Sequence, residues 1–335
     1  MTKFYKYLIL IGSLINLQSC AQDNKKMDEK ATTILGSLYQ DVKHYEQRIN
    51  YHATVSPEDC NYEFLINDYP VDRYFGPDER STSGSIPINI AILKPGTQTW
   101  KIKIYPLRDR KEVNGKVTLV PQQNISSNAK VQIAIEGIRF AENGNIEKRF
   151  GKVLDYKADL KKEDATVKPV LNDEEQSYIE YSGTFEGTVP YVMDGWEKSQ
   201  DISKMDTVTL KKQLLSKYQQ YHDWLQHRKL GEIAQQKLPA EKEIAQAFFY
   251  DKKTNENFLA TFLQRWGQKD LEMQPLENYK VAFYGNGKII TLVDIVDGSS
   301  PLWGNYKVEE NRYKHNTYLI YFHLPQGKKE LEVIR

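Results

Sequence analysis

Apolar residues recur every three or four positions over residues 27–48, and this spacing predicts an amphipathic helix. The apolar stripe comprises Ala31, Ile34, Leu38, Val42 and Tyr45. Such a helix gains most of its stability from packing its apolar face against other elements. We therefore expect it to pack on the domain that follows it in the sequence.

From residue 51 the period falls to two, which predicts β-strands with one buried face. The strand patterns cover residues 51–55, 60–64, 86–93, 99–105, 116–120, 130–140 and 178–191. Asn67-Asp68 and Pro95-Gly96 have the composition of tight turns between strands. About six to eight strands with little helix between them predict an antiparallel β-sandwich over residues 51–195.

The pattern becomes helical after residue 195. Asp206 can cap a helix whose apolar face is Leu210, Leu214, Tyr218, Tyr221 and Leu225. Two further helices are expected at about 240–249 and 254–267, and strand patterns follow at 279–284, 288–296, 318–324 and 330–334. The predicted fold class is α+β: an N-terminal antiparallel β-sandwich followed by a C-terminal domain, residues 196–335, of about three helices and an antiparallel sheet. We expect Trp196 to pack between the two domains.

The element order of residues 206–335 resembles the nuclear-transport-factor-2-like superfamily. The resemblance implies a cone-shaped domain whose helices and curved sheet enclose an apolar pocket. Element order alone implies no function.

The first twenty residues have a layout of their own. Lys3 and Lys6 precede an apolar run from Tyr7 to Leu17, and Gln18-Ser19-Cys20 follows. This layout resembles the signal peptide of bacterial lipoproteins. The resemblance implies a signal peptide over residues 1–19 and lipidation of Cys20, with the anchor, a linker and the amphipathic helix in residues 20–50. It also implies a chain held at a membrane of the cell envelope, with the outer membrane favoured over the inner one because Ala21 follows the cysteine.

Composition excludes several classes of protein. The 46 basic and 45 acidic residues nearly balance and form no long block, so nucleic acid is not an expected partner. If Cys20 is lipidated, Cys60 is the one remaining thiol, which excludes an internal disulfide and a cysteine-based zinc site. The 22 tyrosines are typical of strands that have one solvent-exposed face, and also of surfaces that contact a partner.

No catalytic, metal or cofactor motif emerges from the residue pattern. His222 and His227 are five residues apart, about 140° around a helix, which does not suit shared metal ligation. Cys60 follows Asp59, whose charge disfavours a reactive thiolate, and we expect it to be a half-buried strand residue. Asp294 and Asp297 lie at or near an Asp-Gly dipeptide, which is the ordinary sequence signal of a turn and not of a catalytic site. We expect no cofactor and no bound metal.

Two aromatic segments are candidate binding surfaces. The first contains Arg73, Tyr74 and Phe75, and the second contains Trp303 and Tyr306. Aromatic and arginine side chains are enriched in binding hot spots. The alternative interpretation is structural: a loop over an aromatic core in the first case, and a core plug in the second.

The whole layout resembles bacterial envelope lipoproteins, some of which neutralise toxins delivered between cells by type VI secretion. The resemblance rests on the lipid anchor, on Ser-x-Pro-Ile-x-Ile-x-Ile-Leu-Lys-Pro-Gly at residues 85–96 and on residues 331–335. It implies a non-catalytic lipoprotein that binds a protein partner. One such lipoprotein would be an immunity protein, which binds a toxin and neutralises it. Two alternatives remain open: a carbohydrate-binding or surface-assembly lipoprotein, and an enzyme that uses His315 or His323 in a pocket of the C-terminal domain.

Overall fold

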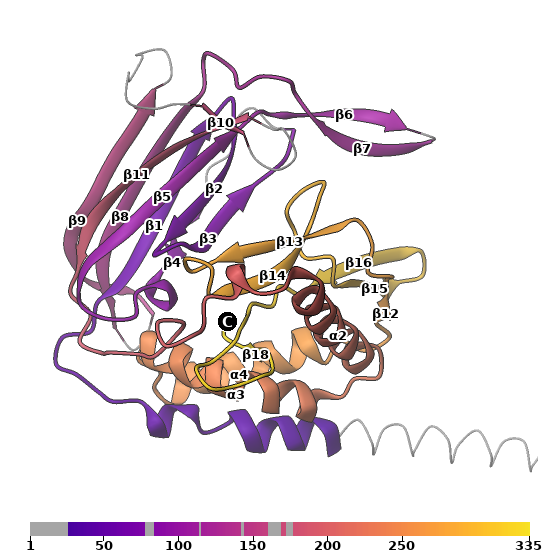
Figure 1. Ribbon diagram of the computed structural model, residues 1–335. Coiled ribbons are helices and arrows are strands. Elements are labelled where there is room, and N and C mark those ends of the chain that lie inside the picture. Colours follow the sequence, from indigo (N-terminus) through magenta and orange to yellow (C-terminus); the bar gives the residue numbers. More distant parts are fainter. Residues whose placement is uncertain (1–25, 78–83, 114, 142–143, 160–168, 172–176) are drawn as a thin grey trace, which may run out of the picture.

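The computed structural model describes residues 26–77, 84–113, 115–141, 144–159, 169–171 and 177–335. Within these residues the chain has an α+β fold, which confirms the predicted class. A β-sandwich from the first half stands against a layer of helices and smaller sheets from the second half (Figure 1). The lipoprotein-like segment and Cys20 lie outside the described residues.

Two antiparallel sheets form the sandwich, with strand orders β4-β1-β8-β9 and β10-β11-β5-β2-β3. Their strands are β1 Asn50–Glu58, β2 Asn61–Ile66, β3 Tyr69–Tyr74, β4 Ile86–Pro87, β5 Gly96–Tyr105, β8 Lys130–Phe140, β9 Ile146–Asp159, β10 Pro169–Leu171 and β11 Ser177–Gly187. Alternate apolar residues of both sheets meet in one core, where the rings of Trp100 on β5 and Tyr156 on β9 lie 4.7 Å apart. A separate hairpin, β6 Arg108–Val113 and β7 Lys116–Pro121, projects from one end of the sandwich (Figure 1).

The turn predicted at Asn67-Asp68 is confirmed. Both residues have positive φ, 50° and 59°, and they join β2 to β3. Two-residue hairpin loops need this conformation, because its twist matches that of the strands, and Asn and Asp tolerate it better than most side chains.

The strand predicted over residues 86–93 is wrong beyond Pro87. Asn89–Ala91 form a short 3-10 helix, η2. The buried Asn89 side chain forms hydrogen bonds with backbone groups that would otherwise bond to a neighbouring strand. Its Oδ1 accepts a hydrogen bond from the Tyr51 amide at 2.6 Å, and its Nδ2 donates to the carbonyls of Ile49 and Ala247 at 2.9 and 3.0 Å.

The second half contains the predicted helices and two small sheets. The helices are α2 Thr207–Gln226, α3 Leu230–Ala247 and α4 Lys252–Trp266, and η3 Ile202–Lys204 precedes them. The Asp206 carboxylate accepts hydrogen bonds from the amides of Val208 and Thr209, which confirms the predicted cap of α2. Helix α3 begins ten residues before the predicted start, at Leu230, although Pro239 lies inside it.

The two sheets of the second half have strand orders β12-β15-β16 and β13-β14-β17-β18. Their strands are β12 Glu272–Met273, β13 Tyr279–Tyr284, β14 Ile289–Asp294, β15 Trp303–Glu309, β16 Arg312–Thr317, β17 Phe322–His323 and β18 Glu332–Val333. The long strands predicted at 318–324 and 330–334 are therefore wrong in extent. The β15–β16 hairpin was not predicted, since exposed and half-buried residues follow one another along it without the alternation of a buried face.

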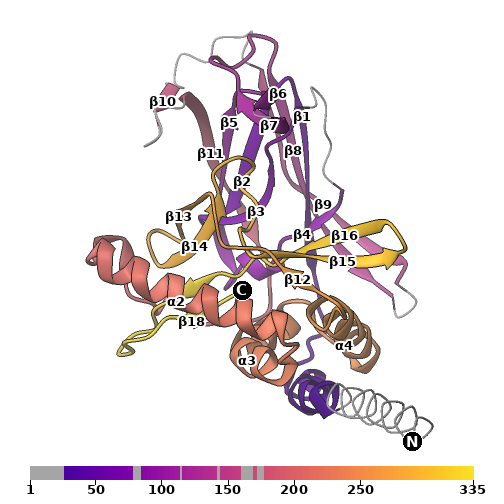
Figure 2. The ribbon, with the colours of Figure 1, turned by 90° about the vertical axis from the view of Figure 1, so that its right-hand side faces the viewer.

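The N-terminal helical segment packs on the second half of the chain, so the expectation that it packs on the sandwich is wrong. Residues 26–35 are helical, and η1 Leu38–Asp41 follows. Their apolar stripe joins the core of the helical layer, and the Asn255 side chain on α4 donates to the Leu35 carbonyl at 3.0 Å. Figure 2 shows this segment beside α3 and α4, away from the sandwich.

Trp196 packs between the two halves, as predicted. Its ring stacks on Tyr69 of β3 at 5.4 Å, and the Arg335 guanidinium lies over it at 5.6 Å. The sandwich core continues past this point, because Phe249, Tyr284 and Tyr321 of the second half belong to it. The two halves thus share buried apolar surface.

Candidate functional site

The outer face of β2 and β3 is covered by the β13–β14 hairpin, and we call this contact the seam. The Tyr284 hydroxyl at the end of β13 donates to the Glu63 carboxylate on β2 at 2.6 Å. The amide of Gly285 in the hairpin loop donates to the Asp68 carbonyl at 2.8 Å. All six residues of β2 are buried because one face of the strand enters the sandwich and the other enters the seam.

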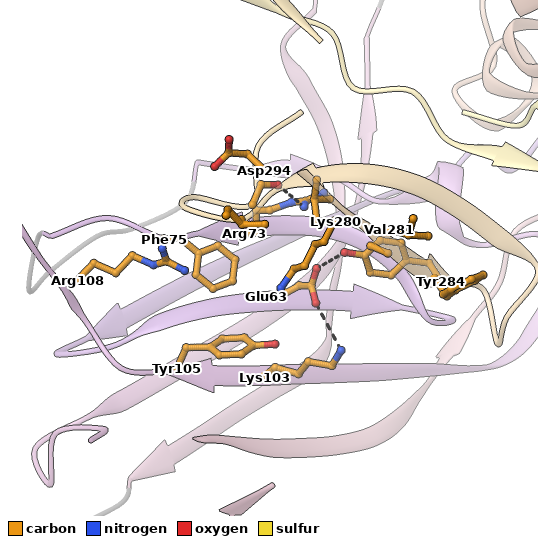
Figure 3. Close-up of a pocket in the computed structure, with 15 residues that line it drawn as sticks. Glu63, Arg73, Phe75, Lys103, Tyr105, Arg108, Lys280, Val281, Tyr284 and Asp294 are labelled. Carbon is orange, nitrogen blue, oxygen red and sulfur yellow. Dashed lines mark hydrogen bonds and ion pairs between the residues drawn. The ribbon is translucent and has the colours of Figure 1, made fainter. Parts of the chain in front are cut away.

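A cavity of about 260 Å³ opens to solvent in the seam (Figure 3). Strands β2, β3 and β5, with Phe75 after β3 and Arg108 at the start of β6, supply one wall. Strands β13 and β14 and the loop after β14 supply the other. Its lining residues are Glu63, Arg73, Phe75, Lys103, Tyr105, Arg108, Lys280, Val281, Ala282, Phe283, Tyr284, Val293, Asp294, Ile295 and Gly298. A concave site with a few convergent polar groups is the usual form of a binding site.

Basic side chains outnumber acidic ones around this cavity. The basic residues are Arg73, Lys103, Arg108 and Lys280, and the carboxylates are Glu63 and Asp294. Both carboxylates already have partners. Glu63 accepts from Tyr284 and lies 3.5 Å from the Lys103 ammonium, while Asp294 accepts from the backbone amides of Val296 and Asp297 at 2.6 and 3.2 Å. The cavity lining therefore carries two more basic than acidic side chains, and one of the four bases, Lys103, is itself the ion-pair partner of Glu63.

Burial shapes the protonation of two of these groups. Burial and the nearby Glu63 carboxylate raise the pKa of Tyr284 well above its usual value, so the phenol stays neutral and donates its proton to that hydrogen bond. Burial also raises the pKa of Asp294, against the lowering effect of the two amides that it caps. The carboxylate of Asp294 thus combines a turn-capping role with a place in the cavity lining.

Aromatic rings form part of the cavity wall. The ring centroids of Phe75 and Tyr105 are 5.2 Å apart, and the Arg108 guanidinium lies 5.3 Å from the centre of the Phe75 ring. Such a wall gives a flat apolar surface beside the charges.

The first predicted binding segment is divided by the alternation of β3. Arg73 and Phe75 line the seam cavity, and Tyr74 does not. Tyr74 pairs with Tyr62 across β2 and β3 and packs against the sandwich core, on the other face of the sheet. Arg73 is also a contact between the halves, because its guanidinium donates to the Gly298 carbonyl at 2.6 Å and to the Tyr321 hydroxyl at 2.8 Å.

The second predicted segment lies elsewhere. Trp303 and Tyr306 are on β15, and neither lines the seam cavity. Trp303 is half-buried and meets His315 of β16 edge to face at 6.3 Å, while Tyr306 packs against the helical core. The structure therefore does not bring the two predicted segments together.

The remaining lining residues were missed in the sequence. Glu63, Lys103 and Lys280 lie on strands, where a charged residue between apolar neighbours normally indicates the solvent face. Only the packing of the second half on the first turns that face into a recess. Asp294 had a sequence signal, the Asp-Gly turn beside it, but the signal pointed to turn formation alone.

His323 and His315 have different environments. His323 on β17 is buried and lines another cavity of about 330 Å³, and its Nδ1 lies 2.7 Å from the Ser199 hydroxyl. Burial lowers the pKa of His323 to about 4, so the ring is neutral near pH 7. His315 is exposed on β16.

A third cavity, of about 590 Å³, lies between the sandwich and the start of α4. Phe140, Phe248 and Tyr250 line it together with the carboxamides of Asn50 and Asn257. Aromatic rings with carboxamides around them are one combination that can bind a sugar. This cavity is the place in the fold that the carbohydrate hypothesis would use.

Cys60 lies in the turn between β1 and β2 and is fully buried, so the expectation of a half-buried strand residue is wrong. Burial, with the neighbouring Asp59 carboxylate, raises the pKa of its thiol to about 12. A thiol with this pKa is a poor nucleophile near pH 7.

In the described ranges, no three His, Cys, Asp or Glu side chains gather as metal ligands would. None of the helices in the same ranges is both long and apolar enough to cross a membrane. The likeness of residues 206–335 to the nuclear-transport-factor-2-like superfamily stays a prediction. No protein-family model matches this chain, and neither does any curated protein or solved structure with which it was compared.

Proposed function

We propose that this chain is a lipid-anchored protein of the bacterial envelope, held at the outer membrane, that binds a partner protein at the seam cavity. The observation that carries the proposal is the composition of that cavity. An aromatic wall and four basic side chains line the recess together with two carboxylates, one of which, Glu63, is paired with the base Lys103. Such a set of groups recognises a ligand by charge and shape.

The position of the N-terminal segment supports the proposed anchor. Five residues separate Cys20 from Lys26, the first described residue, and a chain of that length reaches at most about 20 Å from one of these two residues to the other. Residues 26–42 pack on α3 and α4, on the far side of the helical layer from the sandwich (Figures 1 and 2). A lipid on Cys20 would thus keep the helical layer near the membrane and the sandwich away from it.

Within this proposal, an immunity role is the form that we favour. A lipoprotein at the envelope stands where toxins delivered between cells act, and toxin neutralisation needs tight binding without catalysis. A positively charged recess would suit an acidic surface on the toxin.

The test uses a chain that begins at Ala21 as bait in envelope and secreted fractions of the source bacterium and of its neighbours. We expect one stoichiometric protein partner, identified by mass spectrometry. The Lys280→Glu variant, which reverses a charge in the cavity lining, should retain less of it. Lys314→Glu, on the exposed strand β16, is the matched control. Repeated failure to retain any partner, with bait whose folding is verified, would overturn the proposal.

A second candidate function is hydrolysis at the Ser199–His323 pair. The favouring observation is the 2.7 Å contact between the Ser199 hydroxyl and a histidine that burial keeps neutral, at the wall of the 330 Å³ cavity. A fluorophosphonate probe should then label wild-type chain and leave Ser199→Ala unlabelled. Absence of labelling in the wild-type chain would remove this candidate.

A further inference from the structure

The strand β13 forms one wall of the seam cavity and is an edge of its sheet. Among the described strands, β13 pairs with β14 alone. Successive side chains of a strand point to opposite faces, so a cavity on one face contacts every second residue. The seam cavity contacts five consecutive residues of β13, from Lys280 to Tyr284, and it therefore reaches the backbone edge of the strand.

The two faces of β13 have different surroundings. Ala282 and Tyr284 pack against the sandwich core, while Tyr279, Val281 and Phe283 pack against the helical core. An apolar cavity of about 160 Å³ lies on the helical side. It is lined by Thr207, Val208, Leu210, Lys211, Val281, Phe283 and Ile290. Val281 and Phe283 line both cavities, so a charged recess and an apolar recess flank the same strand edge.

Two exposed apolar side chains lie at or near the start of α2, and one of them, Val208, lines the second recess. Val208 at the start of α2 is 77 % exposed and Met205 is 43 % exposed. Large apolar side chains with this exposure, next to an open strand edge, are features of surfaces that bind another chain.

We propose that a partner protein adds an extended, acidic segment to the edge of β13. The proposal rests on the proposed function, since it names the chemistry of that partner. An added strand lies about 4.8 Å from its neighbour and directs alternate side chains to opposite faces. Acidic side chains of the segment enter the seam cavity beside Lys280, Lys103 and Arg108, and the apolar ones between them enter the recess at Val208.

Charge complementarity selects this occupant. Lysine on an edge strand opposes pairing with a second copy of the same edge, because two like charges would then be adjacent. The same lysine attracts an acidic strand. The basic lining of the seam cavity extends this preference beyond a single residue.

Defined peptides test the proposal on the chain that begins at Ala21. The first probe is a fluorescent peptide of four Glu-Val repeats, the second replaces Glu by Lys, and the third replaces two central residues of the acidic peptide by Pro. We expect the acidic peptide to bind at least tenfold more tightly than either of the others. We also expect it to slow amide hydrogen exchange in residues 279–284, since strand addition protects the edge amides.

Two variants locate the binding. Lys280→Glu and Val208→Glu should each weaken the acidic peptide at least fivefold, one through the charged recess and the other through the apolar recess. The matched controls are Lys314→Glu and Val192→Glu, because Val192 is 76 % exposed and lines neither cavity. Circular dichroism verifies that each variant is folded.

Three outcomes would overturn the inference: no saturable binding of the acidic peptide up to about 1 mM, equal binding of the proline-interrupted peptide, or binding that is unchanged in Lys280→Glu and Val208→Glu. Equal binding of the interrupted peptide would mean recognition of charge without strand addition. If one of these outcomes is found and the bait nevertheless retains a partner protein, the proposed function stands and the proposal of strand addition fails.

Discussion

The hydroxyl of Tyr284 donates a hydrogen bond of 2.6 Å to the carboxylate of Glu63, and the bond joins the two halves of the chain across the seam. Both side chains are buried. The Lys103 ammonium lies 3.5 Å from the same carboxylate. The seam therefore depends on a charged group that would be costly to leave without donors.

Replacing Tyr284 with Phe should lower the free energy of unfolding by about 1–3 kcal/mol, because a buried carboxylate loses its shortest hydrogen bond. Urea unfolding followed by circular dichroism measures the change. Tyr313→Phe is the control, since Tyr313 is 60 % exposed and its loss of a hydroxyl should have little effect. Equal effects of the two substitutions would contradict the role of the Tyr284–Glu63 bond.

Trp196→Ala should lower the free energy of unfolding by about 3–5 kcal/mol, the usual cost of truncating a fully packed large aromatic. Trp196 is 4 % exposed between Tyr69 and Arg335. Trp303→Ala, which removes a half-buried ring, should cost less. Because the halves share buried surface, we expect the wild-type chain to unfold in one calorimetric transition. Two separate transitions would show that the halves fold independently.

His323 should make stability depend on pH between about 4 and 6.5. In the unfolded chain its pKa is near 6.5, and burial lowers it to about 4 in the folded chain, so the unfolded state binds the proton more readily. Stability is then lost as the pH falls through this window, by about 3 kcal/mol in total. Denaturant unfolding at several pH values measures this slope. His323→Asn should reduce it and His315→Asn should not, and an unchanged slope in His323→Asn would contradict the assignment.

The Cys60 thiol should be inert in the folded chain. Its pKa of about 12 and its 1 % exposure both oppose reaction with a thiol reagent near pH 7. In the chain that begins at Ala21, Cys60 is the one cysteine, so the count of reacting thiols reports on this residue alone. We expect no reaction over minutes in buffer and one equivalent in concentrated guanidinium chloride. Rapid reaction in buffer would show that the β1–β2 turn opens.

Cys20→Ser should release the chain from the membrane fraction if Cys20 carries the anchor. We expect the wild-type chain to sediment with membranes and to enter detergent extracts, and the variant to stay in the supernatant. Mass spectrometry of the wild-type N-terminal peptide should show the added acyl chains. A Cys20→Ser chain that still sediments with membranes would contradict lipidation at this position.

The sequence predicted best the elements whose apolar residues recur at a regular period without interruption. The α2 helix has a stripe from Leu210 to Leu225 and an Asp206 cap, and both are as expected. The β9 strand was missed, because three register shifts against β8 interrupt its alternation. A bulge changes the face that each following residue occupies, so the period of two is lost.

Contacts between segments far apart in the sequence determine which surface covers an apolar face and which residues line the cavity, and a local pattern does not predict these contacts. The stripe from Ala31 to Val42 predicts a covered face, but it carries no information on which surface covers it. Likewise Arg73 and Phe75 were candidates for a contact surface, while Lys280 and Lys103 had no local signal that distinguishes them from ordinary solvent-facing residues. The seam cavity forms only where β13 packs against β2 and β3.

The first helical segment meets its partner surface only late in the synthesis of the chain. Lys30 on that segment meets Glu232 on α3, 202 residues later in the chain. A ribosome that makes the chain releases the apolar stripe long before its partner surface exists. The stripe therefore stays uncovered during translation. If the chain is exported as we propose, this delay would keep the segment unfolded until the chain has crossed the membrane.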